Sequence, residues 1–161
     1  PIPEAYFGGK WHWMRGWQDS ASNYRVLEDT ALPVLVQKIA DTGKPVIFEE
    51  ELDFTQRFVD MFPELPLIIP HLGLLGGYPM DFLKAFKDSE NVYFDTALGS
   101  TDMIRTFVKV LGPERVLFGS DVPFGTMKSE LAKVLALSLS PADRDLLLFG
   151  NITRLAKLDL G

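Results

Sequence analysis

Three side chains that could do chemistry directly follow short apolar runs. Asp121 comes after "RVLFGS", His71 after "LPLIIP", and Glu49 after "KPVIF". An apolar strand has no structural need for a carboxylate at its tip, so Asp121 is a candidate for chemistry. Carboxylates and imidazoles together can bind a divalent ion such as zinc or manganese, or form a general base with orienting carboxylates. Both chemistries stay open at this point.

Two further polar residues end apolar runs. His12 ends "GGKWH", and it is one of only two histidines in the chain. Because His12 lies between Trp11 and Trp13, a role in the core or in stacking is an equal alternative. Asp95 ends "NVYFD", and for this residue a structural role is the favoured interpretation. The glutamates that begin at Glu49 are consecutive, so they cannot all face one way.

Apolar runs of strand length alternate with segments of helical period along the whole chain. In the first such segment, Leu32, Val36 and Ile39 recur at helical spacing. The runs between these segments are continuously apolar, which is typical of a parallel sheet covered on both faces and predicts an α/β fold. The carboxyl ends of parallel strands meet at one edge, so the polar tips should converge there. The predicted strands are 5–12, 44–50, 65–71, 91–96 and 115–121.

Composition limits the class of protein. The chain has 161 residues, 47% of them hydrophobic, which is enough for a single domain over 1–161. Its net charge of −6 argues against a nucleic-acid partner. No apolar run is long enough to cross a membrane, and no signal peptide begins the sequence. Because it has no cysteine, a reducing, cytoplasmic location is expected.

The ordered series of segments resembles the C-terminal part of the metal-dependent hydrolases of the amidohydrolase-related family. "RVLFGSDVP" followed by "NITRLAKL" resembles the end of that family, and "LPLIIPHLGLLGG" resembles its strand-six histidine segment. "NVYFDT" is similar to strand seven, while "GGKWH" and "GKPVIF" are similar to strands four and five. The resemblance implies a partial (β/α)8 TIM barrel, consisting of the five C-terminal β/α units.

The resemblance also implies an activity and a set of site residues. Members of the family hydrolyse amides and lactones with the help of a metal, or decarboxylate aromatic and related acids without oxidation. By this resemblance Asp121 is a metal ligand that accepts a proton from water, and His71 is an acid/base or substrate-binding residue. Glu49 stands where the family usually has a metal-binding histidine, so the implied zinc or manganese set is Asp121, Glu49 and His71.

We therefore expect a metal-dependent hydrolase of a small amide, lactone or carboxylated substrate. A decarboxylase on the same scaffold and a non-catalytic barrel subunit without its metal are the alternatives. The stretch "KWHWMRGW" contains all three tryptophans of the chain. It makes Lys10, His12 and Arg15 the expected substrate-binding residues, for a flat aromatic or carboxylated molecule. A loop filling or subunit contact is the alternative role for the tryptophans.

The sequence contains no His-x-His, which the family carries at the end of strand one, and the resemblance begins at strand four. Five β/α units cannot close a barrel and would leave an unpaired strand edge. We therefore expect a fragment, a nicked protein, or a subunit that a missing N-terminal segment or a second chain completes. An oligomer that covers this edge is the expected assembly.

Overall fold

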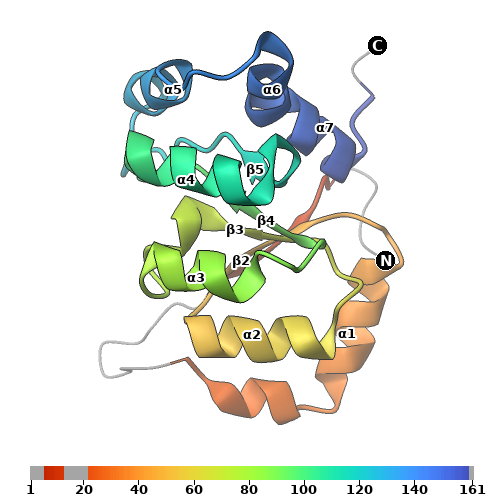
Figure 1. The fold of residues 1–161 in the computed structure, drawn as a ribbon. Coiled ribbons are helices and arrows are strands. Elements are labelled where there is room, and N and C mark those ends of the chain that lie inside the picture. The colour runs from red at the N-terminus through yellow and green to blue at the C-terminus, as the bar shows by residue number, and fades with distance from the viewer. Residues whose placement is uncertain (1–5, 13–21, 160–161) are drawn as a thin grey trace.

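Residues 6–12 and 22–159 are described by the structure, which is a computed structural model. Five parallel strands form one sheet in the order β1-β2-β3-β4-β5, so each strand pairs with the next one along the chain (Figure 1). This confirms the α/β fold predicted from the sequence, with shorter strands than the apolar runs indicate. The strands are β1 Gly9–His12, β2 Val46–Glu49, β3 Leu67–Ile69, β4 Val92–Asp95 and β5 Val116–Leu117.

A helical segment follows each strand, as expected for repeated β/α units (Figure 1). The α-helices are α1 Ala31–Ala40, α2 Leu52–Met61, α3 Pro79–Phe86, α4 Thr101–Leu111, α5 Met127–Leu135, α6 Pro141–Asp145 and α7 Asn151–Ala156. The shorter elements are the 3₁₀ helices η1 Tyr24–Glu28, η2 Pro70–Gly73 and η3 Pro113–Arg115 and the π-helix η4 Leu146–Gly150. No helix in these parts of the chain is long and apolar enough to cross a membrane.

The main core lies between one face of the sheet and the helices α2, α3 and α4. Phe48 and Phe94 point from the strands into this core and are fully buried. Phe58, Phe82 and Phe107 reach them from the three helices. Burial of this many aromatic rings is the main stabilising contribution, because each ring removes a large apolar area from water.

The opposite face of the sheet is covered only in part. Leu155 of α7 packs there against Ile68 and Leu117, whereas Ile47 is 36% exposed. The sequence predicts a sheet covered on both faces, and in a (β/α)8 barrel the inner face packs against opposing strands and not against helices. A pocket of about 720 Å³ opens on this face, lined by Gly9, Lys10, Ile47, Ile68, Ile152 and Ala156 among others.

Candidate active site

Glu49, at the carboxyl end of β2, is the centre of a polar cluster. Its Oε2 lies 3.0 Å from His12 Nδ1 and 3.3 Å from Lys10 Nζ. Its Oε1 lies 3.6 Å from His71 Nε2. The parallel register places His12 directly beside Glu49, which explains the shorter contact. The structure thus brings together four residues that the sequence nominates for the site.

Alternation along β1 separates the site residues from the core. Lys10 and His12 point to the inner face of the sheet, while Trp11 between them points to the other face. There the Trp11 ring stacks on Phe48 with a centroid distance of 5.6 Å. Trp11 is therefore a core residue, while the predicted binding residue Arg15 lies outside the described residues.

The three consecutive glutamates have separate partners, as their alternating directions require. Glu50 is buried and accepts a hydrogen bond from Trp11 Nε1 at 2.9 Å. The Ser22 hydroxyl donates a second hydrogen bond to Glu50. Glu51 accepts the backbone N–H of Ser22 at 3.0 Å. Only Glu49 enters the cluster, so Glu50 and Glu51 instead hold the chain at residue 22.

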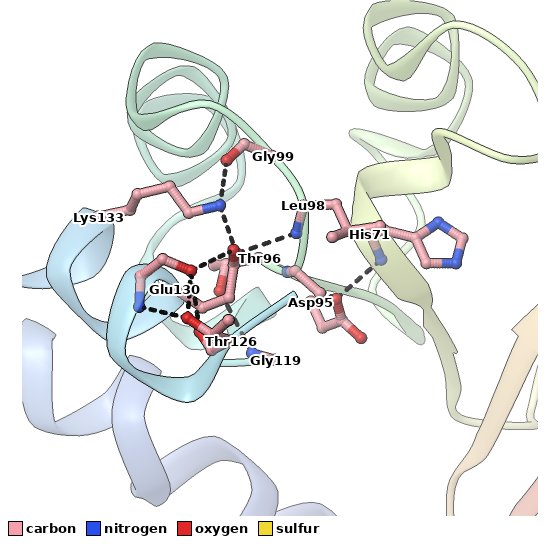
Figure 2. Close-up of polar contacts among 11 residues, drawn as sticks. His71, Asp95, Thr96, Leu98, Gly99, Gly119, Thr126, Glu130 and Lys133 are labelled. Atoms are coloured by element: carbon pink, nitrogen blue, oxygen red, sulfur yellow. Dashed lines mark hydrogen bonds and ion pairs between the residues drawn. The ribbon is translucent and has the colours of Figure 1, made fainter. Parts of the chain in front are cut away.

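His71 lies directly beyond β3 in a backbone conformation that is rare outside glycine. Its φ is 41° and the φ of Leu72 is 56°, both in the left-handed region. The fully buried Leu72 side chain fixes this turn on one side. On the other side, the His71 N–H donates to Asp95 Oδ1 at 2.8 Å (Figure 2). These two anchors hold His71, a residue that is only 3% exposed.

Asp95 is the residue that joins β4 to the His71 turn. Its Oδ1 also accepts the N–H of Ala97, at 2.9 Å. The pKa of Asp95 is raised from 3.8 to about 6, chiefly by burial and in part by the nearby Asp121 carboxylate. The two N–H donors and the charge of Lys10 oppose this rise. The side chain thus has the structural role that the sequence favoured, in direct contact with the backbone of a candidate catalytic residue.

Asp121 follows β5 in a loop with a left-handed backbone, φ 46°. Its carboxylate is close enough to act on the pKa values of His71 and Asp95, both of which it raises. Gly119 explains the small residues before it, because a Cβ there would lie 2.7 Å from Asp95 Cγ. Glycine thus lets the tip of β5 approach Asp95. Direct contact of Asp121 with His71 and Glu49 stays a prediction.

The His71 imidazole is held as a neutral base. Burial lowers its pKa below the usual 6.5, against the opposing influence of Glu49 and Asp121. Its Nδ1 is buried without a hydrogen-bond partner in the part of the chain that the structure describes. A neutral imidazole with one nitrogen facing Glu49 and the other unpaired can accept or donate a proton.

A second polar network fixes the loop that follows β4, and sequence analysis missed it. Glu130 of α5 is 5% exposed and accepts the N–H of Leu98 at 3.0 Å. Glu130 also forms an ion pair with Lys133, whose Nζ donates to the Gly99 carbonyl at 2.8 Å (Figure 2). In the sequence, Glu130 and Lys133 have the i,i+3 spacing of an exposed helix face, so no local signal separates them from solvated charges.

Parallel strands alternating with helices, with their carboxyl ends at one edge, are the architecture of part of a TIM barrel. Residues 7–158 match the family model described as amidohydrolase (Amidohydro_2). The chain therefore belongs to the amidohydrolase family, which confirms the resemblance seen in its segments. Among curated protein sequences, none matches the chain.

Solved structures share the fold at low sequence identity. Amidohydrolase 2 from Bifidobacterium longum subsp. infantis is 17% identical with a TM-score of 0.74, over 99% of this chain and 64% of its own. An amidohydrolase from Burkholderia multivorans with bound zinc is 17% identical with a TM-score of 0.64, over 83% and 60%. A dihydroxybenzoic acid decarboxylase from Polaromonas sp. JS666 with bound manganese is 20% identical with a TM-score of 0.54, over 85% and 46%. The chain thus spans less than two thirds of these proteins.

The zinc and manganese in these relatives indicate a divalent metal in the family. Within residues 6–12 and 22–159, however, no three His, Asp or Glu side chains gather closely enough to hold a metal ion. The Oε2 of Glu49 faces the Lys10 ammonium and the His12 ring instead. As arranged here, these donors do not fit a divalent ion, and metal binding by the set of Asp121, Glu49 and His71 stays a prediction.

Proposed function

We propose that the protein containing this chain is a hydrolase of a small amide, lactone or carboxylated substrate. The observation that carries the proposal is the Glu49 carboxylate placed between His71, His12 and Lys10 at the carboxyl end of the sheet. This is the edge where TIM-barrel enzymes hold their catalytic residues. Membership of the amidohydrolase family supports the same class of reaction.

Exposure divides the cluster into two layers with different roles. The side chains of His71 and Glu49 are only 4% and 11% exposed, which suits proton transfer away from bulk water. Lys10 and His12 are 53% and 40% exposed, so a substrate can reach them. We assign Lys10 and His12 to substrate binding, together with Arg15 on the strength of the sequence.

In the hydrolytic step, Asp121 takes a proton from the attacking water while the water oxygen bonds to the substrate carbonyl carbon. Asp121 passes this proton to the neutral His71 imidazole, and the resulting imidazolium donates it to the leaving nitrogen or oxygen as the carbon–heteroatom bond breaks. Because burial lowers the pKa of His71, the imidazole is neutral at pH 7 and gains a proton only while that transfer is under way. Glu49 stabilises the imidazolium that forms, since its Oε1 faces the His71 Nε2.

Decarboxylation of a small acid is the second candidate. It is favoured by the ammonium of Lys10 beside a buried proton donor, because that pair would hold a carboxylate and deliver a proton to the carbon that loses carbon dioxide. A non-catalytic barrel subunit is the third. For each, we propose that a further segment or a second chain pairs with β1, whose only partner in the described sheet is β2.

Two substitutions in the complete polypeptide test the proposal. Asp121→Asn and His71→Gln keep the shape of the side chains but remove their proton transfer, so each should lower turnover by about 10²–10⁴-fold. Asp60→Asn, on the exposed face of α2, is the matched control. Activity is assayed on a panel of carboxylated lactones, amides and aromatic acids, and the class that is consumed separates hydrolysis from decarboxylation.

Thermal unfolding of the same variants separates a catalytic role from a structural one. We expect Asp121→Asn to unfold close to the wild-type temperature. If this variant instead unfolds early while keeping its activity per folded molecule, Asp121 is a helix or turn cap and the catalytic assignment fails. If no member of the panel is consumed by the wild-type protein, the non-catalytic alternative holds.

A further inference from the structure

The Lys10 side chain extends along the inner face of the sheet toward Glu49, which lies two residues further along β2 than the residue paired with Lys10. In the register of β1 with β2, Lys10 lies beside Ile47 and not beside Glu49. Its aliphatic stem lines the apolar pocket with Ile47, while its Nζ lies 3.3 Å from Glu49 Oε2. Although the Lys10 side chain is 53% exposed, its ion pair with Glu49 directs the ammonium at this one carboxylate.

The charges around this ammonium are mostly negative. The Glu49 carboxylate is its direct partner. The Asp121 carboxylate lies close enough for its charge to act on both His71 and Asp95. The positive charge of Lys10 acts on the same two residues. Among these groups, Lys10 therefore supplies the compensating positive charge.

A divalent ion on Glu49 would need the position that this ammonium takes. Metal binding requires a free carboxylate oxygen, and a cation 3.3 Å away repels a second cation strongly in a partly buried site. The same Oε2 also faces His12 Nδ1 at 3.0 Å. The oxygen is thus already engaged by two groups of this chain.

We propose that the Lys10 ammonium is the built-in counter-cation of this site and that it keeps Glu49 from binding a divalent metal. The ammonium replaces the charge that a metal would supply beside Glu49, and it leaves the carboxylate oriented toward His12 and His71. The inference concerns the same site as the proposed function but holds for any of the three candidate reactions. Its test measures metal binding and not turnover, so the two can fail separately.

The test compares zinc and manganese binding to metal-free complete polypeptide by isothermal titration calorimetry. Lys10→Met keeps the apolar stem and removes the charge, so it should bind zinc at least about tenfold more tightly than the wild-type protein. Lys38→Met, on the exposed face of α1, is the control and should match the wild type. Adding Glu49→Gln to Lys10→Met should abolish the gain, because the freed carboxylate is then missing.

Two results would overturn the proposal. One is a wild-type protein whose zinc binding weakens when Glu49→Gln is introduced, since Glu49 would then ligate a metal despite Lys10. The other is a folded Lys10→Met protein that gains no affinity. If Lys10→Met does not fold, as judged by circular dichroism, Lys10→Gln takes its place, and the Glu49→Gln comparison in the wild-type background decides the question alone.

Discussion

Asp95→Asn tests whether the carboxylate that anchors His71 is held at a cost in stability. The Asp95 Oδ1 accepts two backbone N–H groups, from His71 and Ala97. An amide oxygen can accept the same two hydrogen bonds. The substitution therefore removes the charge while the acceptor that fixes the His71 turn stays in place.

The magnitude follows from the pKa of Asp95, which is raised from 3.8 to about 6, chiefly by burial. Because the folded state binds this proton more tightly than the unfolded chain, the contribution is fully present below the unfolded value near pH 4 and is lost as pH rises through 6. The difference corresponds to at most about 3 kcal/mol, and the partial exposure of the side chain lowers it. At pH 7 the ionised carboxylate thus destabilises the fold.

The assay is urea unfolding followed by circular dichroism at several values between about pH 4 and pH 7.5. The free energy of unfolding of Asp95→Asn, relative to the wild type, should rise with pH by about 2–3 kcal/mol over this range. Asp60→Asn on the exposed face of α2 should show no such rise. A pH-independent loss of unfolding free energy, added to this rise, would come from the unpaired amide N–H of the new asparagine. Parallel pH curves for Asp95→Asn and wild type would refute the reasoning.

Two further predictions concern packing and assembly. Gly119→Ala places a Cβ 2.7 Å from Asp95 Cγ and should lower the free energy of unfolding by about 1–3 kcal/mol, whereas the control Gly9→Ala meets only Val46 Cγ2 at 3.5 Å. Equal urea midpoints for the two variants would contradict the close approach. Because Ile47 on the inner face is exposed and β1 pairs only with β2 within the described sheet, the chain produced alone should self-associate. Sedimentation of a folded monomer of 18.1 kDa would contradict this.

The sequence by itself was enough to predict a parallel α/β sheet and the edge at which the polar residues meet. Continuously apolar runs separated by helical segments require parallel strands, and parallel strands end at one edge. His12, Glu49 and His71 could therefore be predicted to converge before any distance was known, and the structure brings them together. Asp121 lies near enough to affect the charge state of His71.

Tertiary structure alone decided which of these side chains meet and how they are held. No local pattern distinguishes Glu49, which enters the cluster, from Glu50, which bonds Trp11 39 residues away. The Asp95 bond to the His71 backbone and the reach of Lys10 past Ile47 are equally invisible in the sequence. Each depends on strand register and on the direction of a side chain from the sheet, which are fixed only when the strands pair and the core packs.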